Sequence, residues 1–228
     1  MDRSIRTEAV HGGRVDLADL GCHAPPLDLS STYPLPSLAD ATADLDAMAH
    51  GGRPQGNSVY ARLHNPTVDR FEQALARLEG TEESVAFSSG MAAMTACLLA
   101  AREHGDHVVA IRPLYGGTDH LLTSGLLGMD VTWCPPEGVV DAIRPETALV
   151  ILETPANPTL ELVDIEMVLK QAGDVAVLVD STFATPVLQR PAELGASLVL
   201  HSATKFLGGH GDVIAGVVAA NEEWSAAL

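Results

Sequence analysis

Lys205 follows an apolar run and stands between hydroxyl-bearing residues and a glycine-rich loop in the segment LVLHSATKFLGGHGD. The chain has 13 lysines and arginines together, and only two of these, Lys170 and Lys205, are lysines. A lysine in an apolar setting shifts toward its neutral amine, the form that adds to carbonyl groups. The sequence therefore predicts a buried, nucleophilic Lys205; a lysine whose stem covers apolar surface while its head reaches water is the alternative.

Asp180 is a second candidate, because it comes directly after the apolar run VAVLV. A carboxylate at that place lies at the carboxyl edge of a buried strand, where it needs a cationic partner. The functional interpretation is an anion that keeps a ring nitrogen protonated. An aspartate that caps a helix or a turn is the alternative.

The segment VAFSSGM is a candidate anion site. A strand, a Ser-Ser-Gly turn and a helix that begins at Gly90 and Met91 would aim free backbone N–H groups and the helix dipole at one point. Taken alone, this pattern also fits an ordinary turn with a serine cap. Together with Lys205 and Asp180, it makes the set that pyridoxal phosphate (PLP) needs: an amine for the aldehyde, a carboxylate for the ring nitrogen and an anchor for the phosphate.

Other chemistries fit the sequence less well. The chain has neither a G-x-G-x-x-G dinucleotide motif nor a P-loop. His201, His210 and Asp212 could be drawn as a metal site, but the glycine-rich loop accounts for them, and we predict no metal. The three cysteines are far apart and in no metal spacing, so we expect reduced thiols.

Apolar runs and helical patterns alternate after Gly80, and these elements must position the candidate residues. The expected strands are residues 84–89, 107–111, 131–134, 148–154, 175–180, 198–204 and 212–220. The expected helices are residues 90–105, part of 114–128, and 162–173. This alternation predicts an α/β fold, a mostly parallel central sheet with helices on both faces, whose ligands bind at the carboxyl ends of the strands.

Residues 1–60 differ from the rest, because they hold short Pro, Gly and Ser clusters and one helix candidate, residues 37–49. We predict an extended N-terminal arm that contacts a neighbouring subunit; a floppy terminus is the alternative. A helix follows, with Asn65 as its cap, Pro66 at its first position and Gly80 at its end. The predicted division is the arm, 1–60, and a PLP-binding domain, 61–228.

The composition limits the partners. Hydrophobic residues make up 46% and charged residues 19%, which predicts a well-filled core. The formal net charge is −17, so we expect no nucleic acid and no anionic membrane as a partner. The polar start MDRSIRTEAV does not read as a signal peptide, and no apolar stretch is long enough to span a bilayer. We therefore predict a cytoplasmic protein.

Six segments are similar to a known family, the Cys/Met-metabolism PLP enzymes, which include cystathionine γ-synthase, cystathionine lyases, methionine γ-lyase and homoserine-ester sulfhydrylases. The segments are YARLHNPT (60–67), SSGMAA (88–93), LYGGT (114–118), ETPANPT (153–159), VDSTFATPVLQRP (179–191) and HSATKFLGGHGD (201–212). They cover nearly the whole chain in the family's order. The resemblance implies the large domain of a fold-type I, aspartate-aminotransferase-like PLP enzyme.

The resemblance also implies roles for single residues at the cofactor ring. Lys205 would form the Schiff base (the internal aldimine) and then move protons between the α, β and γ positions of the substrate. Asp180 would pair with the pyridinium nitrogen. Tyr115 would stack on the ring, and Asn157 would hydrogen-bond the ring hydroxyl.

The phosphate contacts follow from the same resemblance. The implied contacts within one chain are the backbone N–H groups of Gly90 and Met91 and the hydroxyls of Ser202 and Thr204. Tyr60 and Arg62 would reach the phosphate of the neighbouring subunit, and Arg62 would supply a bidentate cation. The active site would then form in a dimer, and the family usually builds homotetramers as dimers of dimers.

The implied reaction is γ-elimination or γ-replacement on a sulfur amino acid or a homoserine ester, as in cystathionine γ-synthase and γ-lyase. Methionine γ-lyases typically carry a cysteine two residues after the stacking tyrosine, where this chain has Gly117, as the cystathionine enzymes do. Methionine γ-lyase, an O-acylhomoserine sulfhydrylase and β-elimination remain alternatives. The family's C-terminal domain, with the arginine for the substrate carboxylate, has no match here, so a truncated, non-catalytic PLP-binding oligomer partner is a further alternative.

Overall fold

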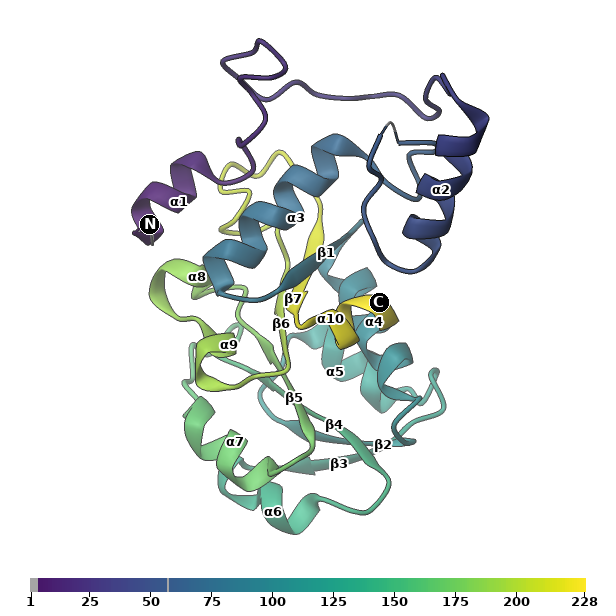
Figure 1. Cartoon of the computed structure of the whole chain (residues 1–228). Helices are drawn as coiled ribbons and strands as arrows, with labels where there is room; N and C mark the ends of the chain where they lie inside the picture. The colour runs from purple at the N-terminus through teal and green to yellow at the C-terminus, as the bar shows by residue number, and fades with distance from the viewer. Residues whose placement is uncertain (1–3, 57) are drawn as a thin grey trace. The chain divides into compact units, whose positions relative to one another are not determined.

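The computed structural model describes residues 4–56 and 58–228, and Figure 1 shows its helices and strands. The chain divides into two compact units, residues 1–78 and residues 79–228. The second unit contains the whole sheet. The division lies after most of the helix that begins at Pro66, so that helix groups with the N-terminal residues.

The strands are β1 Glu83–Phe87, β2 His107–Ile111, β3 Asp130–Cys134, β4 Thr147–Glu153, β5 Ala176–Asp180, β6 Leu198–His201 and β7 Gly216–Ala220. The helices are α1 Ile5–His11, α2 Leu38–Ala49, α3 Pro66–Glu79, α4 Gly90–Ala101, α5 Gly116–Thr123, α6 Val139–Ala142, α7 Ile165–Ala172, α8 Thr185–Leu188, α9 Pro191–Leu194 and α10 Glu222–Ala227, with a 3₁₀ turn at Pro136–Gly138.

The seven strands form one sheet in the order β1-β7-β6-β5-β4-β2-β3. The pairs β2–β3, β2–β4, β4–β5 and β5–β6 are parallel, whereas β7 runs antiparallel to both β6 and β1. Parallel neighbours need crossover connections, which the helices supply. The predicted mostly parallel α/β fold is confirmed.

Alternating side chains of the buried strands point to opposite faces of the sheet, and each face has its own apolar cluster. In β2, Val108 and Ala110 pack in a cluster with residues of α4, whereas Val109 and Ile111 pack in a cluster with residues of α7. Every residue of β2, β4 and β7 is buried. Because both faces are covered, these strands have continuous apolar sequences.

The N-terminal unit begins with a helix that the sequence pattern did not predict. Ser4 caps α1 by accepting a hydrogen bond from the Thr7 N–H, and Arg77 forms an ion pair with Glu8 at 3.4 Å. Arg70 forms a bidentate pair with Asp16 in the segment that follows. Ion pairs between residues far apart in the sequence stabilise the segment around α1. The local sequence pattern therefore does not indicate this helix.

The predicted start of α3 is confirmed. Asn65 Oδ1 accepts hydrogen bonds from the N–H groups of Thr67 and Val68, and Pro66 is the first helical residue. Gly80 follows the last helical residue with φ of +79°, a conformation that favours glycine. The expected strand 212–220 forms only over Gly216–Ala220.

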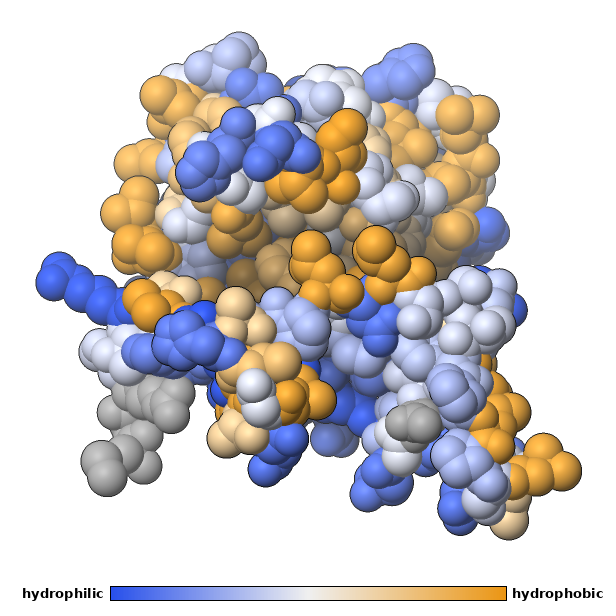
Figure 2. All heavy atoms as spheres, turned by 90° about the horizontal axis from the view of Figure 1, so that it is seen from above, coloured by the Kyte–Doolittle hydropathy of each residue, from blue (hydrophilic) through white to orange (hydrophobic). Residues whose placement is uncertain are grey.

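Apolar side chains are exposed in both units, and Figure 2 shows several of them as orange groups on the face seen from above. Leu29 in the first unit is 93% exposed, and Leu188 in the second is 79% exposed. Single exposed leucines are normal in proteins. Within residues 4–56 and 58–228, no helix combines the length and the apolar character that a membrane crossing requires.

His107, the first residue of β2, is fully buried at the amino edge of the sheet. Its ring nitrogens lie 2.7 Å from Thr147 Oγ1 and 2.9 Å from Thr132 Oγ1. Burial, with a smaller effect of the Arg144 charge, lowers the pKa of His107 below its usual value of 6.5. The unfolded chain therefore binds a proton at a higher pH than the folded chain does.

We predict that His107 makes the free energy of unfolding fall as the pH falls below about 6.5, the pKa of histidine in the unfolded chain. The loss should continue until the pH reaches the lower pKa of His107 in the folded chain. Urea unfolding at pH 5.5 and 7.5 measures this loss. His107→Gln should reduce the loss, whereas His120→Gln, at an exposed position, should keep it. Equal pH dependence in the chain and in His107→Gln would contradict the prediction.

Candidate active site

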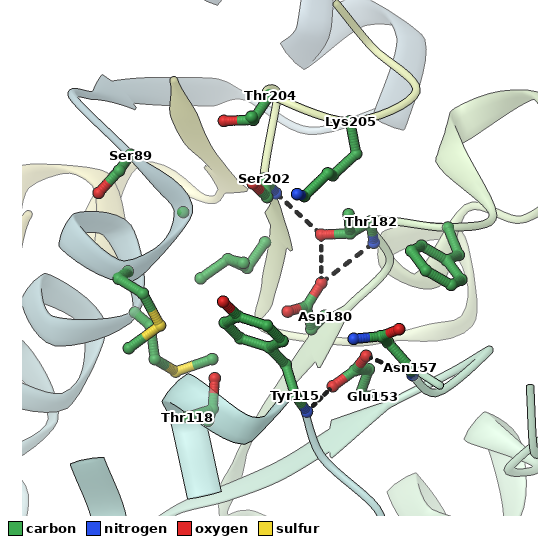
Figure 3. A pocket seen from close by; sticks show the side chains of 15 residues that line it. Ser89, Tyr115, Thr118, Glu153, Asn157, Asp180, Thr182, Ser202, Thr204 and Lys205 are labelled. Carbon is green, nitrogen blue, oxygen red and sulfur yellow. Dashed lines mark hydrogen bonds between the residues drawn. The ribbon is translucent and has the colours of Figure 1, made fainter. Parts of the chain in front are cut away.

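A cavity of about 330 Å³ lies in the C-terminal unit beyond the carboxyl ends of the parallel strands (Figure 3). This volume is at the lower end of the range for small-molecule sites, and the place is where α/β sheets bind ligands. The predicted residues that line it are Gly90, Met91, Tyr115, Asn157, Asp180, Ser202, Thr204 and Lys205. The structure therefore brings together every site residue that was predicted in the C-terminal unit.

Tyr60 and Arg62, the other two predicted residues, lie in the N-terminal unit. The guanidinium carbon of Arg62 lies 5.3 Å from the centre of the Tyr60 ring, a cation–π contact. Tyr60 is 40% exposed. Their contact with the phosphate of a neighbouring subunit stays a prediction.

The start of α4 forms one wall of the cavity. Ser89 caps the helix, because its hydroxyl accepts a hydrogen bond from the Ala92 N–H at 3.1 Å. The N–H groups of Gly90 and Met91 have no hydrogen-bond partner among the described residues. Free N–H groups and the helix dipole favour an anion at this point.

Two glycines allow three segments to meet at this helix start. A Cβ atom on Gly90 would lie 2.7 Å from Ser202 Cβ, and a Cβ atom on Gly216 would lie 2.2 Å from the Ser89 carbonyl oxygen. Both distances are far below van der Waals contact. Glycine at these positions therefore lets the ends of β6 and β7 approach the anion site.

Asp180 ends β5 and is buried at the floor of the cavity. Its Oδ1 accepts hydrogen bonds from the Thr182 hydroxyl at 2.5 Å and from the Thr182 N–H at 3.1 Å. The Thr182 hydroxyl oxygen also accepts the N–H of Ser202 at 2.8 Å. Burial raises the pKa of Asp180, because the charged form has lost solvation. A protonated ring nitrogen would supply the positive charge that neither Thr182 group carries.

Glu153 is a site residue that was not singled out in the sequence. It ends β4, it is buried, and it lies opposite Asp180 in the parallel register (Figure 3). Its Oε1 accepts the Asn157 N–H at 2.8 Å, and its Oε2 accepts the Tyr115 N–H. Burial and then the nearby Asp180 raise the pKa of Glu153 to about 7. The sequence does contain a feature that indicates Glu153, because this residue, like Asp180, is an acid at the end of an apolar run.

Lys205 differs from expectation, because its side chain is exposed at the cavity and not buried. The strand β6 ends at His201, and Lys205 lies in the turn beyond it, with its N–H donating to the Ser202 carbonyl at 3.0 Å. The strand therefore stops four residues before the lysine. Figure 3 shows the side chain reaching from this turn to the cavity.

Thr204 has a structural role beside its place in the cavity lining. Its hydroxyl donates to the Ala215 carbonyl and accepts from the Ala215 N–H, both at 3.1 Å. These two bonds close the loop between β6 and β7, in which Lys205 lies. Thr204 thus helps to fix the position of the lysine turn.

Both histidines of the alternative metal site have other partners. His201 is fully buried and lies 2.6 Å from Glu79 Oε1, whereas His210 is exposed and lies 3.1 Å from the Gly208 carbonyl. In the part of the chain that the structure describes, no group of three or more His, Cys, Asp or Glu residues has the arrangement of a metal site.

Gly117 and Gly116 are neighbours in the first turn of α5 but have different surroundings. A Cβ atom on Gly117 would lie 2.7 Å from Tyr115 Cε1 and 2.9 Å from Met91 Sδ, whereas one on Gly116 would meet nothing within 4 Å. Gly117 thus allows the Tyr115 ring and the Met91 side chain to occupy their places at the cavity.

We predict that Gly116→Ala stabilises the chain by about 0.4 to 1 kcal/mol, because alanine restricts the unfolded chain and fits the site. Gly117→Ala should give no gain or a loss, because the tyrosine ring or the methionine must move. Urea unfolding of both variants measures the difference. Equal stabilisation by the two substitutions would show that Gly117 has no steric role.

Comparison with known proteins agrees with this geometry. The family model of the Cys/Met metabolism PLP-dependent enzymes matches residues 6–228. The L-methionine gamma-lyase of Streptomyces avermitilis is 61% identical over 99% of this chain and 55% of that protein. The L-methionine gamma-lyase of Brevibacterium aurantiacum is 54% identical over 97% of this chain and 55% of that protein.

Among solved structures, the crystal structure of metB from Corynebacterium glutamicum matches with a TM-score of 0.83 and 33% identity. The match covers 98% of this chain and 58% of that chain. The fold is therefore that of the fold-type I PLP enzymes, as predicted. The chain spans about half the length of the curated relatives that it matches. With a match over almost its whole length, the chain belongs to the family of Cys/Met metabolism PLP-dependent enzymes.

Proposed function

We propose that Lys205 binds PLP covalently and that the protein eliminates the γ-substituent of a sulfur amino acid, with L-methionine as the leading substrate. One observation carries the proposal. A single cavity collects a lysine amine, a buried carboxylate and a helix start with free N–H groups. These groups match the aldehyde, the ring nitrogen and the phosphate of the cofactor.

The cavity fits the cofactor ring on three sides. Asp180 would keep the ring nitrogen protonated, and this charge would in turn offset the cost of burying the carboxylate. The Tyr115 side chain lines the cavity, where it would stack on the ring, and the Asn157 amide would hydrogen-bond the ring hydroxyl. Figure 3 draws these three side chains around the same space.

The phosphate would lie at the start of α4. Gly90 and Met91 would donate their free N–H groups, and the Ser202 hydroxyl lies beside Gly90. The Thr204 hydroxyl donates to the Ala215 carbonyl, so it would join them only by turning its proton from that carbonyl to the phosphate. Such a set of neutral donors at a helix N-terminus holds a phosphate without many cations, which suits a chain of net charge −17.

PLP, when bound, delocalises negative charge that develops on the carbon beside the substrate amine. The chain's own task is then proton transfer. Lys205 would take the proton from the α-carbon, release it, and then, as a neutral amine again, take one from the β-carbon, which allows the γ-substituent to leave. Its side chain lines the cavity in which the substrate would lie, which supports this role.

A neighbouring copy of the chain would complete the site. Tyr60 and Arg62 would reach the phosphate bound by that copy, and the whole protein would be a homo-oligomer, a dimer of dimers. A cytoplasmic location is part of the proposal, and the three free cysteines support a reducing compartment.

The substrate is inferred from two observations that point in different directions. Relatives that are 61% and 54% identical carry the name L-methionine gamma-lyase. Gly117, in contrast, follows the pattern of the cystathionine enzymes. Identities of 61% and 54% over nearly the whole chain favour L-methionine. Cystathionine and O-acylhomoserines are the substrates to compare with it.

We predict that the purified chain with PLP has the visible absorption band of lysine-bound cofactor and that Lys205→Ala abolishes it. Lys170→Ala is the matched control, because Lys170 is the other lysine and lies in the last turn of α7, outside the cavity lining. Borohydride reduction followed by peptide mapping should place the pyridoxyl group on Lys205. A pyridoxyl group on Lys170, or on neither lysine, would overturn the proposal.

We also predict that the chain releases a 2-oxo acid from L-methionine, together with a thiol, at a higher kcat/KM than it releases a 2-oxo acid from cystathionine or an O-acylhomoserine. A 2-oxo acid assay with the three substrates measures the ratio. A higher kcat/KM with cystathionine than with L-methionine would show that L-methionine is not the preferred substrate. Normal PLP absorption without turnover of any of the three would leave a PLP-binding chain and overturn the proposed elimination.

A further inference from the structure

Glu153 connects two loops that each contribute a residue to the cavity lining. Tyr115 lies after β2, and Asn157 lies after β4, on separate segments of the chain. One carboxylate accepts both of their N–H groups, one on each oxygen. The two residues whose side chains line the cavity are therefore held at their backbones by one buried group.

A carboxylate of this length is the group that can make both contacts. Glutamine would keep one acceptor oxygen but would present an NH₂ group to the other N–H. Aspartate would keep the charge but would withdraw both oxygens by one methylene. Geometry, and not charge alone, thus accounts for glutamate at the end of β4.

The carboxylate of Glu153 is costly to bury. It is 6% exposed, and Asp180, another acid, lies opposite it in the register of β4 and β5. The pKa of Glu153, raised to about 7, reflects this surrounding. A buried acid beside another acid is typical of functional sites, where a group is kept for a task other than stability.

We propose that Glu153 is a positioning residue, which sets the Tyr115 ring and the Asn157 amide against the cofactor ring by holding the backbone N–H groups of these two residues. This inference rests on the proposed PLP site, because the two side chains matter through that ligand. Glu153 would affect the affinity for the cofactor because it fixes the positions of Tyr115 and Asn157.

Absorbance titration of the full chain with PLP tests the proposal through the dissociation constant. Glu153→Gln should weaken PLP binding about tenfold, the effect of leaving one buried N–H without an acceptor. In a Tyr115→Ala/Asn157→Ala background, the same substitution should change the dissociation constant by less than about twofold. A residue with a merely structural role would weaken binding equally in both backgrounds.

Two further variants separate geometry from charge. Glu153→Asp should weaken PLP binding as Glu153→Gln does, although it keeps the charge; wild-type affinity in this variant would overturn the proposal. Glu161→Gln removes an exposed carboxylate from the same connecting segment, and it should leave the affinity unchanged. Circular dichroism of each variant without PLP confirms folding before titration.

The outcomes distinguish the two levels of inference. Equal tenfold losses in the two backgrounds, with PLP still bound on Lys205 in the unaltered chain, would overturn the role of Glu153 alone. Failure of the unaltered chain to bind PLP on Lys205 would overturn the proposed function and, with it, the role of Glu153. A loss that disappears in the Tyr115→Ala/Asn157→Ala background supports both.

Discussion

Asp180 and Glu153 end neighbouring parallel strands in register, and both carboxyl groups are buried. Two acids in this arrangement oppose folding unless donors or a cation compensate them. Backbone N–H groups of the adjoining loops, together with the Thr182 hydroxyl, provide the compensation in the chain itself. The loops around the cavity are thus shaped by the need to satisfy these carboxylates, and the remaining negative charge suits a cationic ring.

The anion-binding wall depends on close backbone approach. The antiparallel β7 returns the chain to β1, so that Gly216 meets the turn before α4, and Gly90 meets Ser202. A phosphate at this point would be held mainly by backbone N–H groups. Because these groups have fixed positions once the segments are packed, the wall needs no arginine within the same unit.

The two edges of the sheet have different roles. At the amino edge, His107 lies between two threonine hydroxyls, which satisfy its ring nitrogens. At the carboxyl edge, buried acids remain that raise the energy of the folded chain. The acids that line the cavity therefore lie at the carboxyl edge, where parallel sheets with helices on both faces bind their ligands.

Local signals in the sequence determined much of this protein. Continuous apolar runs indicated the strands, Asn65 and Pro66 indicated the start of α3, and the acid and the lysine after two of the runs indicated the cavity, because these patterns depend on near neighbours along the chain. Tertiary structure alone decided the rest. The role of Glu153 depends on the register between β4 and β5 and on a loop from β2, and the exposure of Lys205 depends on where β6 ends. Such features arise from contacts between residues far apart in sequence, which no local pattern contains.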